Sequence, residues 1–323
     1  MRKKKVTVVV PVFNEEWSIA SLWGRLSSMA DAANNIEWNF LFVDDGSLDG
    51  SRARLDELAM RQHAVQVVSL KRNCGVTQAL QAGFDLAEGE YVVTIPANLE
   101  YDPGDIPKVI DGLEKGAECC VGFRMYPKET SLSYTRPLKI LNWMISALAG
   151  LKLTDYECML RGYRGSLVKE LHLPGDLYRY LPAYLSWQGR KIVEVGVEGL
   201  PRSKGWKVRK RPIKNSAKAL LDLVLLRFVF RYSARPFYIF GGLSLLSVLG
   251  GVIAISIAVF RKLFNGVSLI ETPLPLLSAL FFLSGMLLLS LGILAEFLLR
   301  IYRAQIGREF YEIQRSVNSP KDD

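Results

Sequence analysis

Residues that commonly bind zinc or form disulfides are scarce in this sequence, which has two histidines and four cysteines among 323 residues. The cysteines form no C-x-x-C pair, so a zinc centre is not expected. All four precede residue 236, in a part of the chain with ordinary globular composition, and thiols there are typical of a reducing compartment. They are Cys74, Cys119, Cys120 and Cys158.

An apolar run of signal-peptide length is also lacking at the N-terminus. The segment MRKKKVTVVVPV begins with charge, and Pro11 and Asn14 interrupt its apolar part. We therefore expect that the first domain is not exported.

Charged residues are absent from two long stretches, Phe237–Phe260 and Thr272–Ala295. Each is long enough to cross roughly 30 Å of hydrocarbon as a helix. Two buried core helices are the alternative, but the charged flanks favour transmembrane helices. Lysine and arginine are more numerous outside the pair of stretches than between them, which predicts both chain ends in the cytoplasm. In a bacterium, this membrane would be the plasma or inner membrane. The outer residues are Arg231, Arg235, Arg300, Arg303 and Arg308, against Arg261, Lys262 and Glu271 in the loop.

Acidic residues are missing between Glu198 and Asp222, whereas Arg202–Lys218 is rich in lysine and arginine. A basic cluster just before an apolar span indicates contact with anionic membrane lipids. Nucleic acid is the other anionic partner to consider, but no helix-turn-helix or RNA-binding signature is present, so we expect no nucleic-acid binding. Residues 216–235 predict a basic juxtamembrane helix, which lies either in the membrane interface or against the soluble domain.

Strand and helix patterns alternate along residues 1–215. This alternation predicts an α/β domain whose mostly parallel sheet is covered on both faces. The rest of the chain divides into the juxtamembrane helix, two transmembrane helices within 236–300 (about 237–260 and 272–295) and a cytoplasmic tail at 301–323. Strands are expected at Val6–Val10, Phe40–Val43, Val65–Leu70, Tyr91–Ile95 and Glu118–Gly122, and helices at Glu15–Ala33, Ser51–Arg61, Val76–Ala87 and Asp105–Lys115.

Polar residues follow three of the predicted strands, in the segments Pro11–Glu16, Asp44–Asp49 and Pro96–Glu100. Ligands of parallel α/β sheets bind at the carboxyl ends of the strands. A nucleotide needs acceptors for its base and ribose, and cations or a metal for its phosphates. Each polar residue taken alone also suits a helix cap, but their common edge favours a binding site.

Several of these segments resemble known sequence motifs. The runs VVVPVFNEE, FVDDGSLDG and LKRNCGVTQALQAGFDLAEGEYVV are similar to family 2 glycosyltransferases of the GT-A fold, which have a Rossmann-like sheet. DYECMLRGYR, at Asp155–Arg164, the two apolar stretches and RIYRAQIGREFYEI resemble the polyprenyl-phosphate or dolichol-phosphate sugar transferases, nearest the undecaprenyl-phosphate aminoarabinose branch. The resemblance covers nearly the whole chain.

The resemblance implies an inverting transfer of sugar from a nucleotide-sugar, with UDP favoured, to a polyprenyl phosphate. It also suggests a tetramer, to which glycines in the first apolar stretch add a weak hint of close helix packing. The residues implied for the nucleotide-sugar are Pro11, Asn14, Glu15, Asp44, Asp45, Ser47 and Arg72, with the two aspartates on base and ribose. Those implied for phosphate or acceptor are Arg124, Arg136, Asp155, Arg161, Arg202 and Lys207; arginine suits phosphate because it donates in pairs.

The sequence departs from the family where a metal-binding Asp-x-Asp, then Leu-Gln, is expected. Here Pro96 and Asn98 replace the two aspartates, and Glu100 replaces the glutamine. The catalytic and metal candidates are therefore Asn98 and Glu100, and Mg²⁺ or Mn²⁺ is expected to bind with lower affinity. The run PRSKGWKVRKR keeps Arg202, Gly205 and Lys207 of a second motif but not its serine and tyrosine.

Three hypotheses follow from these residues. The first is an active transferase with an altered metal site. The second is a non-catalytic relative that binds lipid phosphate or nucleotide-sugar, motivated by the loss of Asp-x-Asp. The third is a processive polysaccharide synthase, which is disfavoured because it should have more spans and a Q-x-x-R-W motif.

Overall fold

The structure is a computed structural model that describes residues 3–33, 35–125, 146, 150–171, 177–199, 236–265, 272–305 and 313–317. The chain divides into two compact units. Met1–Leu223 and Glu309–Asp323 form the first unit, and Val224–Arg308 form the second. The predicted juxtamembrane helix and the basic cluster before it lie outside the described residues.

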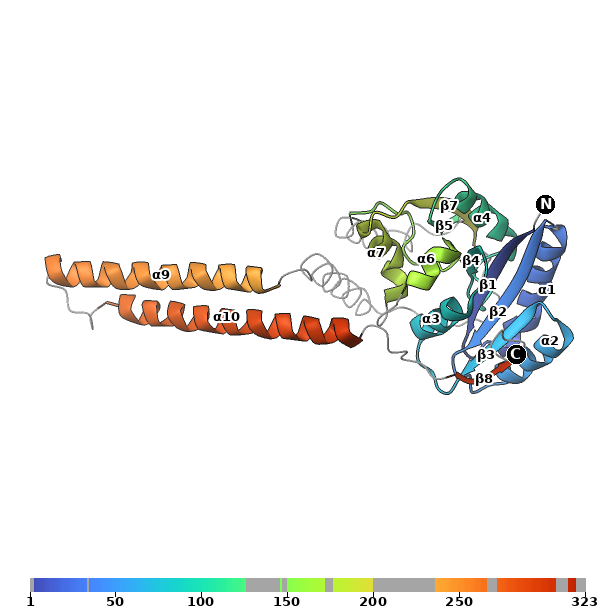
Figure 1. Cartoon of the computed structure of the whole chain (residues 1–323), viewed down its shortest axis with the longest axis horizontal. Helices are drawn as coiled ribbons and strands as arrows, with labels where there is room; N and C mark the ends of the chain where they lie inside the picture. Colours follow the sequence, from blue (N-terminus) through green and yellow to red (C-terminus); the bar gives the residue numbers. More distant parts are fainter. Residues whose placement is uncertain are drawn as a thin grey trace, which may run out of the picture. The chain divides into compact units, whose positions relative to one another are not determined.

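The first unit is built on an eight-stranded mixed sheet with strand order β7-β5-β6-β4-β1-β2-β3-β8 (Figure 1). Strand β6 is antiparallel to β4 and β5, and β8 is antiparallel to β3, whereas the other pairs are parallel. The five predicted strands are confirmed as β1 to β5. The strands are β1 (Lys4–Val12), β2 (Ile36–Asp44), β3 (Val65–Leu70), β4 (Tyr91–Thr94), β5 (Cys119–Met125), β6 (Arg161–Arg164), β7 (Ile192–Glu198) and β8 (Ile313–Val317).

Helices cover both faces of this sheet, as the alternating pattern predicts. Val6, Val8 and Val10 of β1 pack in one core with α1, α2 and α4, and Val9 packs in the other with α3, α6 and α7. Because successive side chains of a strand point to opposite faces, a strand buried on both sides is apolar throughout. The helices are α1 (Glu16–Ala32), α2 (Ser51–Arg61), α3 (Val76–Leu86), α4 (Ile106–Glu114), α6 (Gly165–Glu170) and α7 (Leu181–Trp187), with 3₁₀ turns η1 (Pro103–Asp105) and η2 (Leu177–Tyr180).

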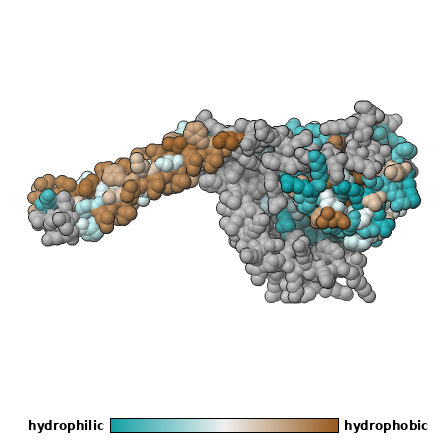
Figure 2. Space-filling model, turned by 90° about the horizontal axis from the view of Figure 1, so that it is seen from below, coloured by the Kyte–Doolittle hydropathy of each residue, from teal (hydrophilic) through white to brown (hydrophobic). Residues whose placement is uncertain are grey.

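The second unit contains two long apolar helices, α9 (Pro236–Asn265) and α10 (Leu274–Gln305). The segments Phe240–Phe264 and Leu274–Leu298 are long and apolar enough to cross a membrane. Figure 2 shows that apolar side chains dominate the visible surface of the paired helices. Such a surface is suited to lipid rather than to water.

The two helices are joined by hydrogen bonds from serines to backbone carbonyls. Ser244 Oγ donates to Gly285 O at 2.7 Å, Ser247 Oγ to Phe281 O at 2.8 Å, and Ser278 Oγ to Gly251 O at 2.9 Å. Small residues allow this close approach, as is usual between helices in lipid. Gly250 and Gly251 of the first span pack against the second helix, and an oligomer contact through the glycines of this span stays a prediction.

We expect Gly285→Val to destabilise the hairpin by about 1–3 kcal/mol, because an added Cβ would lie 2.8 Å from Val248 Cγ2 and 3.3 Å from Ser244 O. Gly242→Val is the matched control, since a Cβ there meets nothing within 4 Å. Thermal unfolding of both variants in the same detergent measures the difference. Equal losses in the two variants would contradict the close packing at Gly285.

Candidate functional site

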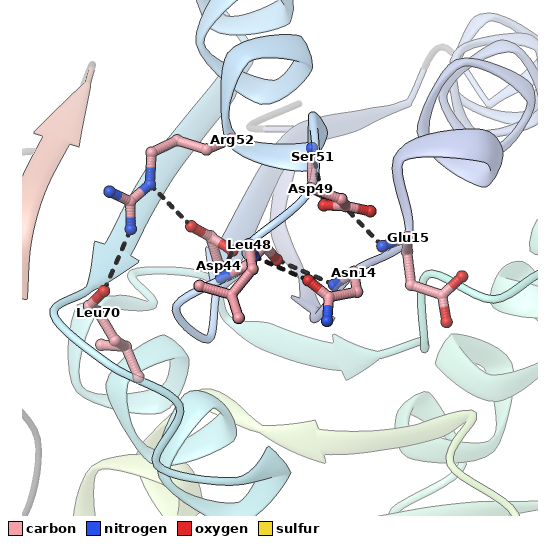
Figure 3. A network of polar contacts seen from close by, with 9 residues as sticks. Asn14, Glu15, Asp44, Leu48, Asp49, Ser51, Arg52 and Leu70 are labelled. Carbon is pink, nitrogen blue, oxygen red and sulfur yellow. Dashed lines mark hydrogen bonds and ion pairs between the residues drawn. The ribbon is translucent and has the colours of Figure 1, made fainter.

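The carboxyl ends of β4, β1 and β2 lie side by side, because these strands are neighbours in the sheet. The three polar segments predicted from the sequence therefore meet at one edge. The first two are bonded directly: Asn14 N donates to Ser47 Oγ at 3.0 Å, and Leu48 N donates to Asn14 Oδ1 at 2.8 Å (Figure 3). Asn14 has a φ of 55°, in the left-handed region that asparagine tolerates better than most residues.

Asp44 and Asp45 are buried, and their carboxylates bind the protein's own donors. Asp44 Oδ1 accepts from Ser47 N at 2.9 Å and Oδ2 from Arg52 Nε at 3.1 Å. Asp45 accepts from Cys74 N at 2.7 Å and Gly75 N at 2.9 Å. Both aspartates thus hold loops in place, and their predicted contacts with base and ribose stay a proposal.

The start of α1 is tied to the loop before α2. Glu15 N donates to Ser51 Oγ at 2.9 Å, and Glu16 N donates to Asp49 Oδ2 at 3.2 Å. Asp49 Oδ1 also accepts from Ser51 N at 3.0 Å. The loops after β1 and β2 therefore form one connected shelf at the sheet edge, and Figure 3 shows the Glu15 side chain directed away from it.

The carboxyl group of Glu15 has a strongly shifted pKa. This pKa is raised to about 7, chiefly by burial; hydrogen bonds from Ser18 and Trp17 oppose the rise, and the negative charges of Asp49 and Glu100 add to it. Glu15 follows β1 and Glu100 follows β4, and these two strands are parallel neighbours in the sheet. Shifted carboxyl groups of this kind are common in binding sites.

The loop after β4 carries the altered metal motif. Asn98 Oδ1 accepts from Glu100 N at 3.1 Å, and Leu99 between them has a φ of 56°. Pro96 offers no ligand, and no group of three His, Cys, Asp or Glu side chains in the described part of the chain could hold a metal. The amide oxygen of Asn98 and the carboxylate of Glu100 fit Mg²⁺ or Mn²⁺ only as part of a shell that a diphosphate completes.

Two acidic residues of the DYECMLRGYR segment pair with arginines. Arg124 on β5 donates to Asp155 through Nε at 2.6 Å and Nη2 at 3.1 Å, and the two side chains are 13% and 12% exposed. Glu157 lies 3.7 Å from Arg179. The resemblance implied that Arg124 faces a phosphate; in the structure its guanidinium forms a two-pronged, largely buried pair with Asp155.

Arg161 occupies the interior of the first unit. It is 2% exposed, and its guanidinium donates to the carbonyls of Tyr156 (2.7 Å) and Tyr178. Its implied acceptor role therefore stays a prediction. In the structure, the Arg161 side chain stabilises the loop of the DYECMLRGYR segment through its hydrogen bond to the carbonyl of Tyr156. Pro11 is buried at the end of β1, and Arg72 is exposed beside Gly46. Arg136, Arg202 and Lys207 lie outside the described residues.

Sequence reasoning missed three side chains that build this site. Arg52 donates both to Asp44 and to Leu70 O, at 3.3 Å for the latter. The side chains of Tyr101 and Thr94 form hydrogen bonds with the backbone N–H and carbonyl of Met159. No local pattern marks these residues, because each acts on a partner that is remote in the sequence or on a neighbouring strand.

We expect the raised pKa of Glu15 to make stability fall as pH rises from about 4.5 to about 7. In that range the folded state binds more protons than the unfolded state, so raising the pH favours unfolding. Glu15→Gln should remove this slope and be more stable than the unchanged protein at pH 8. Urea unfolding at pH 5 and pH 8 checks this; an identical slope in the variant would contradict it.

Comparison with known proteins agrees with this geometry. Residues 7–171 match the model of Glycosyl transferase family 2. Dodecaprenyl-phosphate galacturonate synthase of Rhizobium johnstonii is 34% identical over 303 residues, covering 92% of this chain and 88% of that protein. Undecaprenyl-phosphate 4-deoxy-4-formamido-L-arabinose transferase of Photorhabdus laumondii is 31% identical, covering 98% and 96%.

Solved structures confirm the predicted GT-A fold. Glucosyl-3-phosphoglycerate synthase of Mycobacterium tuberculosis, in complex with Mn²⁺ and UDP-glucose, superimposes with a TM-score of 0.53 and 18% identity. The match covers 69% of this chain and 79% of the synthase. Together with the family match and the two full-length relatives, this places the chain in Glycosyl transferase family 2.

Proposed function

We propose that this protein is a membrane-bound inverting glycosyltransferase that moves a sugar from a nucleotide-sugar, with UDP favoured, to a polyprenyl phosphate. The carrying observation is that two relatives named for polyprenyl-phosphate substrates match over 92% and 98% of this chain, hairpin included. The shelf built by Asn14, Ser47 and Asp49 supports a nucleotide at the sheet edge. Two helices that can cross a membrane, in the same chain as this site, suit an acceptor that resides in the membrane.

The chemistry requires little acid–base assistance. A polyprenyl phosphate is already an anion at neutral pH, so one of its oxygens can attack the anomeric carbon without a strong base. The bond from that carbon to the diphosphate breaks as the new bond forms, which inverts the configuration and releases the nucleoside diphosphate. A cation bound with the donor would neutralise the departing diphosphate, and Asn98 and Glu100 are the residues that would hold it.

The orientation we propose places the first unit and both termini in the cytoplasm. The heavier positive flanks of the two apolar helices favour this side. Strand β8 supports placing both ends of the chain on one side of the membrane, whichever side that is, because residues 313–317 follow both helices and yet pair with β3. The chain therefore leaves the first unit and returns to it, which requires an even number of crossings.

Turnover by the purified full-length protein tests the function. The protein in detergent is incubated with undecaprenyl phosphate and a panel of UDP- and GDP-sugars, with and without Mn²⁺, and lipid-linked sugar is detected by mass spectrometry. We expect product with at least one UDP-sugar. Nucleotide binding by calorimetry without transfer under any condition would instead support the non-catalytic alternative, which Pro96 and Asn98 motivate.

We expect Glu100→Gln to reduce transfer, or its dependence on Mn²⁺, at least tenfold, about 1.4 kcal/mol. The change removes the carboxylate of the altered motif and keeps the side-chain size. Calorimetry of UDP binding with and without Mn²⁺ gives a second readout, in which the variant should lose the gain from metal. Asp102→Asn, on the exposed side of the same loop, is the control, and unchanged Glu100→Gln kinetics and metal response would show that Glu100 holds no cation.

A further inference from the structure

Met159 has both of its backbone polar groups bound by side chains from one short segment. Its N–H donates to the Tyr101 hydroxyl at 3.3 Å, and its carbonyl accepts from Thr94 Oγ1 at 2.8 Å. Thr94 is the last residue of β4, and Tyr101 follows the altered motif. The two residues that flank the segment Ile95–Glu100 are therefore both hydrogen-bonded to Met159.

Tyr101 is suited to a fixed hydrogen bond. The residue is 1% exposed, and its backbone forms an isolated bridge with Gly199. Burial raises the pKa of its hydroxyl well above the usual value, so the group stays protonated. Tyr101 directly follows Glu100 of the altered motif, and its hydrogen bond to Met159 joins it to the loop that carries Asp155.

Met159, the residue that Thr94 and Tyr101 bind, lies in a loop that other hydrogen bonds also hold. Met159 lies four residues after Asp155 in the same loop. Asp155 Oδ1 accepts hydrogen bonds from Glu157 N at 2.9 Å and from Arg124. Arg161 holds the carbonyl of Tyr156 in the same loop. Hydrogen bonds at Tyr156 and Glu157 tie the backbone between Asp155 and Met159, so we expect a displacement of Met159 to move Asp155.

We propose that Thr94 and Tyr101 are positioning residues which, through Met159, fix the distance between the Asn98–Glu100 loop and the Arg124–Asp155 pair. The proposal rests on the proposed function, in which the first loop faces the donor and the second the acceptor. Because Pro96 and Asn98 replace two aspartates, a cation alone would hold the Asn98–Glu100 loop only weakly. The position of this loop therefore depends on the hydrogen bonds of Thr94 and Tyr101 with Met159. Misplacement by about 1 Å is enough to slow a transfer reaction by about a hundredfold.

Tyr101→Phe tests the proposal because it removes one hydroxyl and leaves the ring. We expect kcat to fall at least tenfold while the Kd for UDP, measured by calorimetry, stays within twofold. Tyr91→Phe, at the opposite end of β4, should change neither quantity. A parallel loss of UDP affinity and kcat would overturn the proposal, because it would indicate general loosening of the domain.

Thr94 provides a second, independent variant. Thr94→Val keeps the shape and removes the hydroxyl, and should lower kcat in the same way, whereas Thr94→Ser should restore it. A Thr94→Val protein as active as the unchanged one would contradict the role assigned to this hydrogen bond.

Hydrogen exchange of the peptide that contains Met159 gives a readout independent of turnover. Tyr101→Phe should speed exchange of the Met159 amide at least tenfold, because that N–H loses its acceptor, while Tyr91→Phe should not. Unchanged exchange would show that the Tyr101 hydroxyl does not hold the Met159 amide. If the unchanged protein transfers no sugar but Tyr101→Phe still speeds exchange of the Met159 amide, the proposed function is wrong, whereas the hydrogen bond between Tyr101 and Met159 is supported.

Discussion

Asp155→Asn is expected to reduce sugar transfer at least a hundredfold and to lower the free energy of unfolding by about 3 kcal/mol. Asp155 and Arg124 are each largely buried and share two hydrogen bonds, at 2.6 Å and 3.1 Å. Removing the negative charge of Asp155 weakens the pairing of a guanidinium that is only 13% exposed. The loss of transfer follows because Arg124 is then no longer held in one orientation. Steady-state kinetics and urea unfolding measure the two effects.

A double variant separates the two effects. Arg124→Leu combined with Asp155→Leu removes both charges, so it should recover most of the stability and none of the activity. Asp102→Asn is the half-exposed control, because its 3.7 Å contact with Arg25 contributes about 1 kcal/mol or less and asparagine can still accept the hydrogen bond from Gly104 N. Full activity in the double variant would show that the pair is only structural.

Gly46→Val is expected to abolish measurable nucleotide binding and to cost about 3 kcal/mol of stability. Gly46 has a φ of 68°, which β-branched residues avoid, and an added Cβ would lie 2.5 Å from the backbone carbon of Arg72. The clash is with backbone, so no rotamer change relieves it. It would push apart the loops after β2 and β3, which Asp45 joins through Cys74 and Gly75.

Gly75→Ala is the matched control for the clash. Gly75 also has a positive φ, of 90°, but a Cβ there meets nothing within 4 Å. Gly75 has a ψ of 156°, so its backbone lies in a region that other residues rarely adopt; the alanine variant should lose about 1–3 kcal/mol from this conformation alone, and its N–H can still reach Asp45. Calorimetry with UDP and thermal unfolding compare the variants. Equal effects at the two glycines would mean that contact with Arg72 is unimportant.

The sequence predicts the first five strands and their covering helices well because each is a short, strongly patterned segment. Val6–Val10 is β-branched at every position and apolar at all but Thr7, and the structure buries it on both faces. The antiparallel strand β6 was not predicted. Arg161–Arg164 reads RGYR, which has no strand pattern, and it pairs with β4 and β5 only because the tertiary fold places it between them.

The candidate site was predicted in outline and not in detail. The strand-end rule located Asn14, Ser47 and Asp49 at one edge, where the structure joins the first two by a hydrogen bond. A residue type alone could not show that Asp44 is buried against Arg52, because burial depends on partners from other segments. The same limit applies to Arg161, whose charge suggested phosphate and whose neighbours are backbone carbonyls.

The return of residues 313–317 to the sheet also dictates an order of assembly during synthesis. Val67 pairs with Val317, so the ribosome must translate both apolar helices before β3 receives its outer neighbour. Until then, β3 is an unpaired edge, a state that favours association with other chains. Contacts of such long sequence separation also form slowly. Maturation of the first unit is thereby coupled to completed translation and membrane insertion of the helices, so a chain interrupted within the hairpin is left with an incomplete sheet.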